Sequence, residues 1–151
     1  MAERKAVMSG GCQCGAVRYA LYAEPESSVC HCRMCQKAGG GLFAALSKVT
    51  LADFAWTKGT PGAFRSSSAA ERHFCSGCGT PLTFHYIEGE AIEVTMGSLD
   101  EPVRAPIVRN YCVDTRMPWI DRLVPGALPE ARPSKSGLMS FQHPDRDMPD
   151  T

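Results

Sequence analysis

Cysteines are the residues of this chain whose types and spacing most directly predict chemistry. The eight fall as Cys12 and Cys14, then Cys30, Cys32 and Cys35, then Cys75 and Cys78, with Cys112 alone. Thiolates separated by one or two residues can reach one metal ion from a single tight turn. The spacing therefore predicts metal ligation, with Zn²⁺ as the default ion because it accepts thiolates without redox chemistry.

The two outer pairs of cysteines are both accompanied by glycine. These glycines are Gly15, Gly77 and Gly79. Glycine allows the positive φ that a tight turn around a metal can require. Each pair supplies half of a tetrahedral site, so we expect Cys12, Cys14, Cys75 and Cys78 to hold one structural zinc. The alternative, four ordinary buried thiols, does not account for the close spacing.

The middle group places three potential ligands within six residues. Cys30, Cys32 and Cys35 can present their sulfurs on one face of a loop that enters a helix. Three protein ligands leave one tetrahedral position open, as in catalytic zinc sites. The alternative is an inert site closed by His31 or Cys112. We expect His31 to point away from its neighbours' metal, and Cys112 to be a buried free thiol in an apolar strand.

Iron–sulfur and dithiol redox chemistry fit the spacing less well. The groups do not match the ferredoxin patterns. A redox pair would need a βαβ context, whereas the segment after Cys78, Pro81 to Ile87, has the composition of a β-strand.

Length and charge exclude several other classes of function. The chain has 151 residues, 44% of them hydrophobic, which suits one globular domain. Its 16 basic and 16 acidic residues cancel, and no basic run indicates binding to nucleic acid. No apolar stretch predicts a membrane span or a secretory signal. We therefore expect a cytoplasmic protein whose cysteines stay reduced.

The remaining sequence predicts a mainly β fold. Strands are expected at 16–22, 42–46, 63–67, 71–74, 82–87, 91–96 and 106–111, with short helices at 33–38, 98–101 and 118–122. Prolines recur from Pro125 onward, which indicates a loop or arm. We expect a zinc domain over residues 1–124 and a Pro-rich arm over residues 125–151.

Three further sets of residues carry weaker expectations. Phe43, Tyr111 and Trp119 are predicted to belong to the core rather than to a pocket. His73 and His85 are predicted to be structural, and His143 lies in the arm. Arg33, Lys37 and Arg109 are expected to be solvated surface charges.

The cysteine motifs resemble those of the glutathione-dependent formaldehyde-activating enzyme family, also called the centromere-protein-V-like family. The resemblance rests on Gly10–Tyr19, Cys30–Lys37 and Phe74–Thr80, with weaker matches at Gly97–Asp100 and Trp119–Ile120. Together these segments span residues 8 to 122, which is most of the chain.

The resemblance implies a β-tent fold of antiparallel sheets with short helices, anchored by zinc. It implies a structural zinc on the four outer cysteines and an active-site zinc on Cys30, Cys32 and Cys35. The implied activity is that of a carbon–sulfur lyase with glutathione as co-substrate, interconverting glutathione plus formaldehyde with S-hydroxymethylglutathione. The alternatives are a non-catalytic zinc-binding module that shares the fold, and a detoxification protein for another small thiol.

Overall fold

The computed structural model describes residues 4–123 and residue 128 of the chain. These residues form ten β-strands in two sheets, one α-helix and several short 3-10 helices, which confirms the predicted mainly β class. None of the helices in this described part is long and apolar enough to cross a membrane. Apart from Leu128, the predicted arm lies outside the described residues, as does His143, so the boundary at residue 124 stays a prediction.

The smaller sheet has three antiparallel strands in the order β1-β2-β5. They are β1 (Met8–Gly11), β2 (Arg18–Leu21) and β5 (Phe54–Lys58). The strand β1 is not predicted from the sequence, because its Ser-Gly-Gly run has low strand propensity. Pairing with β2 along all four residues supplies what the local sequence lacks.

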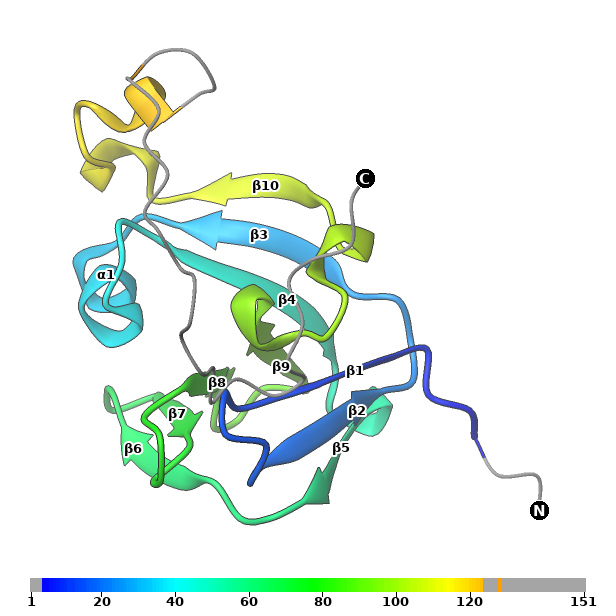
Figure 1. Ribbon diagram of the computed structural model, residues 1–151. Helices are drawn as coiled ribbons and strands as arrows, with labels where there is room; N and C mark the ends of the chain where they lie inside the picture. The colour runs from blue at the N-terminus through cyan, green and yellow to red at the C-terminus, as the bar shows by residue number, and fades with distance from the viewer. Residues whose placement is uncertain (1–3, 124–127, 129–151) are drawn as a thin grey trace, which may run out of the picture.

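The larger sheet has seven strands in the order β10-β3-β4-β9-β8-β7-β6. They are β3 (Glu26–Cys30), β4 (Ala44–Thr50), β6 (Gly62–Arg65), β7 (Ala70–Phe74), β8 (Pro81–Tyr86), β9 (Ala91–Thr95) and β10 (Ile107–Tyr111). The strands predicted at 63–67, 71–74, 82–87 and 91–96 pair as two hairpins, β6–β7 and β8–β9. The expectation of purely antiparallel sheets needs one correction, since the edge strand β10 runs parallel to β3. Figure 1 shows the smaller sheet packed in front of this larger one.

Helical structure is confined to short segments between strands. The α-helix α1 (Arg33–Gly39) follows β3 and ends at Gly40, whose φ is 66°. The 3-10 helices are η1 (Leu51–Asp53), η2 (Met96–Ser98), η3 (Pro102–Arg104), η4 (Val113–Thr115) and η5 (Ile120–Leu123). The helix predicted at 33–38 is therefore confirmed, whereas those predicted at 98–101 and 118–122 are 3-10 turns placed slightly differently.

The core lies between the two sheets. Tyr19 and Leu21 of β2 and Leu82 and Val94 of the large sheet are almost completely buried. The Tyr19 hydroxyl shares a hydrogen bond of 2.7 Å with Ser98 Oγ in η2, which satisfies its polar end. The buried Tyr19 ring and its hydrogen bond to Ser98 together hold β2 in one position against the large sheet.

At Gly10, the backbone of β1 lies too close to the backbone of residues 98–99 to leave room for a side chain. It forms a bridge with Leu99, and a Cβ added to Gly10 would lie 2.5 Å from the Ser98 carbonyl oxygen. We expect Gly10→Ala to destabilise the fold by about 1–3 kcal/mol, as overpacking of a core does. The measurement is the thermal unfolding midpoint. Gly39→Ala is the control, since a Cβ there meets nothing within 4 Å; equal midpoints for the two variants would contradict the prediction.

Three aromatic residues predicted to be in the core are not buried there. Tyr111 is 44% exposed because it belongs to β10, an edge strand whose five residues are all exposed, and Trp119, which lies between η4 and η5, is 45% exposed. Phe43 is half-buried and lines a cavity. The apolar pattern of the sequence does not distinguish an edge strand from a central one, which is why these expectations are wrong.

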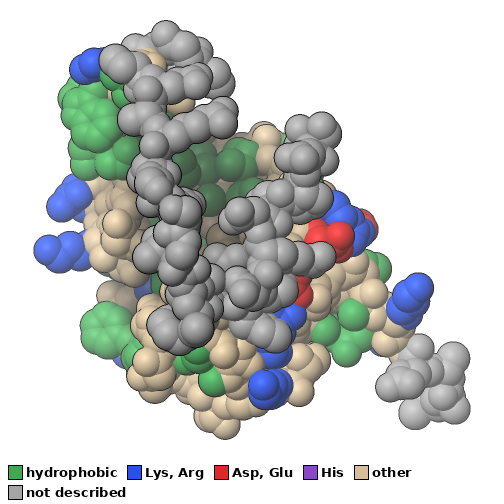
Figure 2. All heavy atoms as spheres, viewed as in Figure 1, with side chains coloured by type: hydrophobic (Ala, Val, Ile, Leu, Met, Phe, Trp, Pro, Cys, Tyr) green, Lys and Arg blue, Asp and Glu red, His purple; other side chains and the backbone are tan. Residues whose placement is uncertain are grey.

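Charged side chains are dispersed over the surface that Figure 2 displays. Where the described atoms are visible, Lys and Arg side chains are scattered and do not form one continuous basic patch. Arg33 and Lys37 are exposed, and Arg109 is paired with Glu26 at 3.1 Å while remaining half exposed. These three cations are the surface charges that the sequence predicted.

Candidate metal centres

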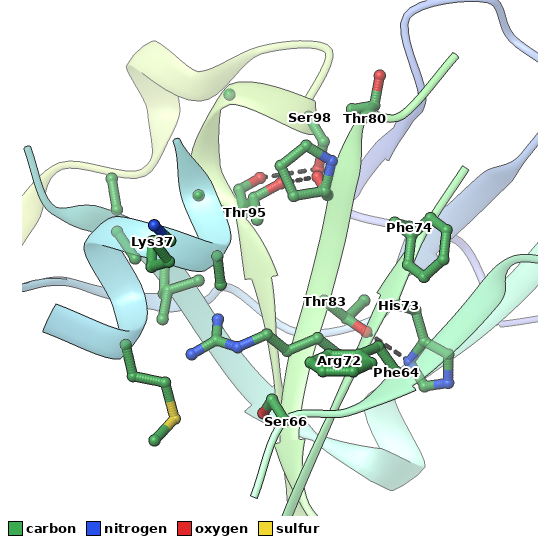
Figure 3. A pocket seen from close by; sticks show the side chains of 18 of the residues that line it. Lys37, Phe64, Ser66, Arg72, His73, Phe74, Thr80, Thr83, Thr95 and Ser98 are labelled. Atoms are coloured by element: carbon green, nitrogen blue, oxygen red, sulfur yellow. Dashed lines mark hydrogen bonds between the residues drawn. The ribbon is translucent and has the colours of Figure 1, made fainter. Parts of the chain in front are cut away.

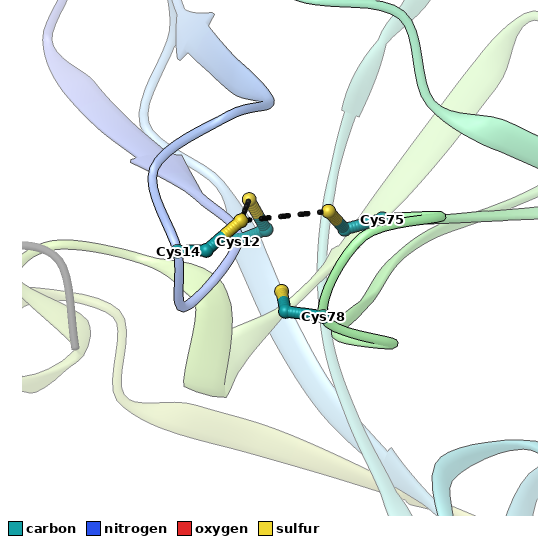
Figure 4. Close-up of side chains that lie close together, drawn as sticks. All are labelled: Cys12, Cys14, Cys75 and Cys78. Carbon is teal, nitrogen blue, oxygen red and sulfur yellow. Dashed lines mark hydrogen bonds between the residues drawn. The ribbon is translucent and has the colours of Figure 1, made fainter. Parts of the chain in front are cut away.

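Four cysteine sulfurs from two distant segments meet at one end of the small sheet. Cys12 and Cys14 lie in the β1–β2 turn, and Cys75 and Cys78 lie in the β7–β8 turn that faces it (Figure 4). The four sulfurs lie within 4.8 Å of one another, with 3.5 Å between Cys12 and Cys14 and 3.8 Å between Cys14 and Cys75. A tetrahedral ion with Zn–S bonds of about 2.3 Å requires sulfurs roughly 3.8 Å apart. The donor set and its spacing therefore fit zinc.

Both turns reverse at a glycine in the left-handed region. Gly15 has φ 73° and donates its N–H to the Cys12 carbonyl, and Gly79 has φ 79° and donates to that of Cys75. Side chains other than glycine rarely adopt this conformation, so each turn depends on its glycine. Gly77, which the sequence also suggested for this role, does not have a positive φ.

Thr80 connects the two turns and was missed by the sequence analysis. The backbone N–H of Gln13 donates to Thr80 Oγ1 at 3.0 Å, and this hydroxyl lies 3.2 Å from Cys78 Sγ. Desolvation opposes ionisation of Cys78, but hydrogen bonds from Thr80, Cys14 and Cys75 together outweigh it, and the pKa of Cys78 falls to about 6. A thiol that ionises easily suits a metal ligand, since the thiolate is the binding form.

The second group of sulfurs lies where β3 runs into α1. Cys30 ends β3, Cys32 is the N-cap of α1, and Cys35 is in its first turn. The three sulfurs lie within 4.8 Å of one another. The Cys35 N–H donates to Cys32 Sγ at 3.3 Å, so the helix start itself orients two of the three sulfurs. Three soft donors that converge from a short rigid segment fit one zinc ion.

The two alternative fourth ligands behave differently. His31 is buried, its Nε2 lies 3.1 Å from Asn110 Oδ1, and it is not part of the close group of sulfurs, as expected. Cys112 was expected to be buried, and this is wrong. It is exposed, adopts φ 54° as it leaves β10, and brings its Sγ within 4.0 Å of Cys30 Sγ. The edge position of β10 turns Cys112 toward the sulfur triad instead of the core.

A network of hydrogen bonds holds the Cys112 segment beside the triad. Buried Gln36 of α1 donates its side-chain N–H to the carbonyls of His31 and Thr115, at 2.8 and 3.3 Å. The Thr115 hydroxyl donates to the His31 and Cys112 carbonyls, both at 3.0 Å. The loop after β10 is therefore positioned by α1 itself. The sequence offered no signal for this contact because the partners lie about 80 residues apart.

The sulfur triad opens into a cavity of about 480 Å³ that also contains Arg72. Arg72 Nη2 lies 3.3 Å from Cys35 Sγ, its guanidinium stacks over Phe84 at 4.7 Å, and its buried Nε has no hydrogen-bond partner among the described residues. Burial raises the pKa of the Cys35 thiol, and the Arg72 charge works against that rise. Arg72 was not singled out from the sequence, where nothing distinguishes it from other surface arginines.

A larger cavity of about 810 Å³ lies on the other side of Arg72. Its walls include Lys37, Phe43 and Phe74, and Arg72 lines both cavities. Figure 3 shows Arg72 extending from β7 toward α1 across this space. The two cavities together offer far more volume than a small aldehyde needs, so a larger ligand can be accommodated beside the triad.

Comparisons with known proteins agree with this architecture. The family model described as glutathione-dependent formaldehyde-activating enzyme matches residues 7–114. An uncharacterised lyase of Schizosaccharomyces pombe is 38% identical over 82 residues, which are 54% of this chain and 59% of that protein. A Halomonas elongata protein with the provisional name glutathione-dependent formaldehyde-activating enzyme is 28% identical over 130 residues, or 76% of this chain and 80% of that protein.

A solved structure supports the fold. The crystal structure of a Rhodobacter sphaeroides protein superposes with a TM-score of 0.54 at 23% identity, covering 68% of this chain and 99% of that one. The chain combines a mainly β fold with two clusters of cysteine sulfurs that can hold metal. These two features are typical of small cysteine-rich metal-binding proteins. Within that class, this chain belongs to the glutathione-dependent formaldehyde-activating enzyme family, as the sequence resemblance indicated.

Proposed function

We propose that the protein is a zinc-dependent carbon–sulfur lyase that makes or breaks adducts between a thiol and a small aldehyde, with glutathione and formaldehyde as first choice. The observation that carries the proposal is the group of three cysteine sulfurs with an open side toward a cavity. Family membership supports a glutathione-related lyase. The four-sulfur cluster would hold a second, structural zinc ion.

The residues of the triad and of its cavity would have different roles in the reaction. Cys30, Cys32 and Cys35 would be the ligands. A zinc ion held there would supply the Lewis acidity that lowers the pKa of a substrate thiol entering the cavity. Arg72, which contacts Cys35, would offset the negative charge of the gathered thiolates.

The reaction requires one proton to move from sulfur to oxygen. In the forward direction the sulfur lone pair forms the C–S bond, the carbonyl π pair moves to oxygen, and that oxygen takes a proton. Glu93 lines the same cavity, and burial raises the pKa of its carboxyl, although the charges of Lys48 and Arg72 oppose that rise. A carboxyl whose pKa is raised in this cavity is the candidate to exchange this proton with the substrate.

The proposal is tested by thiol titration of cobalt-substituted protein. Glutathione is expected to change the cobalt–sulfur absorption bands, whereas S-methylglutathione, which has no free thiol, is expected to leave them unchanged. Cysteine as a second thiol reports how far binding depends on the rest of glutathione. An absence of spectral change with any thiol, or a metal content of one ion per chain with the triad freely alkylated, would overturn the proposal.

Arg72 offers a prediction on activity. Arg72→Met keeps the stem over Phe84 but removes the charge beside Cys35, and we expect about a 10- to 100-fold loss of kcat/KM, the worth of a charge-assisted hydrogen bond. Arg72→Lys should recover part of the loss. Arg65→Met on β6, which removes an exposed guanidinium bonded to the Ser68 carbonyl, is the control. Equal activity of the Arg72→Met and Arg65→Met variants would show that the charge is not used.

Cys112 offers a prediction on the metal. Its sulfur is near Cys30 but does not belong to the mutually close group of three. We therefore expect Cys112→Ser to keep its zinc content and its rate of zinc release to a coloured chelator, while Cys35→Ser loses one ion. Faster release from the Cys112→Ser variant would instead identify Cys112 as a fourth ligand that closes the site.

A further inference from the structure

A third cluster of potential ligands lies on β7 and β8 and shares no residue with either group of cysteines. Glu71 and His73 are two residues apart in β7, so their side chains share one face of the sheet. Glu71 pairs with His85 of β8, and His73 pairs with Thr83, which places all four on that face. Arg72, between them, points to the opposite face and the sulfur triad. Strand alternation thus directs this cluster away from the sulfur triad, although His73 and Thr83 also line the larger cavity.

The ligand atoms of Glu71, His73 and His85 converge. One donor atom from each lies within 4.8 Å of the others, and His73 Nε2 is 3.2 Å from Glu71 Oε1. Metal–nitrogen and metal–oxygen bonds of about 2.1 Å place neighbouring ligand atoms roughly 3–3.5 Å apart. The two imidazole rings are parallel, at an interplanar angle of 1° and a centroid distance of 5.4 Å. Side-chain adjustment alone can therefore close the three donors on an ion.

Thr83 orients His73 through a hydrogen bond, as residues next to the ligands of a metal site commonly do. Its Oγ1 lies 2.8 Å from His73 Nδ1 (Figure 3). This bond fixes the ring, whose Nε2 lies 3.2 Å from Glu71 Oε1. A histidine that ligates a metal through one nitrogen is normally held by a hydrogen bond at the other. Thr83 is buried and can serve His73 in this way without contact with solvent.

A structural role, which the sequence predicted for both histidines, accounts for His73 but not for His85. His73 has hydrogen-bond partners at both nitrogens. The Nδ1 atom of His85 is buried and has no partner among the described residues. Leaving a buried polar atom unpaired costs about 1–3 kcal/mol, so its retention beside a carboxylate needs a reason. A cation shared by the three side chains supplies one.

We propose that Glu71, His73 and His85 form a third metal site that takes one divalent transition ion of the kind that prefers imidazole and carboxylate, such as Zn²⁺ or Ni²⁺. Two imidazoles and one carboxylate make a donor set distinct in chemistry from the two thiolate groups. Three ligands leave further positions open for water. The site does not depend on the proposed lyase function, because it shares no ligand with the triad.

Nickel titration followed by Trp56 fluorescence tests the proposal. The indole of Trp56 lies 5.7 Å from the His73 ring, close enough for a paramagnetic ion on His73 to quench it. With both cysteine groups first filled with zinc, Ni²⁺ is expected to bind once per chain and to quench this fluorescence. Trp56→Phe should abolish the quenching while one Ni²⁺ still binds, which assigns the signal to Trp56 rather than Trp119.

Variants then assign the ligands. Glu71→Gln and His85→Gln are expected to weaken Ni²⁺ binding at least about tenfold, and Thr83→Val less than either. Glu88→Gln, the same charge change in the exposed β8–β9 turn, should leave binding unaltered. Unchanged melting midpoints in zinc-filled protein confirm that these variants fold. Absence of quenching in the wild type, or equal nickel binding by wild type and the His85→Gln variant, would overturn the proposal.

Discussion

Replacing Cys75 by serine is expected to remove the structural zinc ion and unfold the chain. Cys75 and Cys12 are 2% and 0% exposed and belong to the same core cluster as Tyr19 and Leu82. Structural zinc contributes about 10–16 kcal/mol of apparent binding free energy, whereas a whole domain is stable by only about 5–15 kcal/mol. The free energy lost with the zinc ion is therefore as large as the whole stability of a typical domain. The measurements are zinc content and the far-ultraviolet circular dichroism spectrum.

The matched control is Cys112→Ser, which changes one exposed thiol in the same way. It should retain the wild-type spectrum and melting midpoint. A strong chelator should reproduce the effect of Cys75→Ser on the wild-type protein. If the Cys75→Ser variant keeps the wild-type midpoint, the four sulfurs do not anchor the fold.

Replacing Cys32 by serine is expected to abolish catalysis while leaving the fold intact. Cys32 is half-exposed at the start of α1, outside the core cluster, so its loss costs little packing. A catalytic metal contributes several kcal/mol to transition-state stabilisation, so adduct formation above the spontaneous rate should fall by on the order of 10²–10³-fold. Exchange spectroscopy by NMR measures this rate with glutathione and formaldehyde in equilibrium.

The two cysteine variants are expected to separate the two zinc ions. Cys32→Ser should bind one ion fewer and melt near the wild-type midpoint, whereas Cys75→Ser should not give a cooperative transition. An active Cys32→Ser variant would mean that the triad is not the site of chemistry. If the Cys32→Ser variant lost its fold together with its activity, the triad would have a structural role instead.

Much of the architecture could be predicted because short sequence patterns, such as apolar alternation and cysteine spacing, indicate it. The alternation of Ile92 and Val94 predicts a strand with one buried face, and both residues are buried in β9. Close cysteine spacing predicts that sulfurs within each turn converge, whatever surrounds the turn. The strand β3 is not predicted, because its Glu-Ser-Ser start has no apolar alternation. Both serines are nevertheless buried, and Ser27 shares a hydrogen bond with Ser47.

The sequence by itself determined which atoms could bind metal, because ligand type and spacing within a turn are properties of a few neighbouring residues. Only the tertiary structure decided which other side chains lie next to these atoms. Arg72 reaches Cys35 from 37 residues away, and Cys112 meets Cys30 because two strands pair in parallel across 82 residues. The third cluster likewise exists only through the register that sets Glu71 opposite His85. Such pairings are fixed by the packing of the whole sheet, which no local pattern encodes.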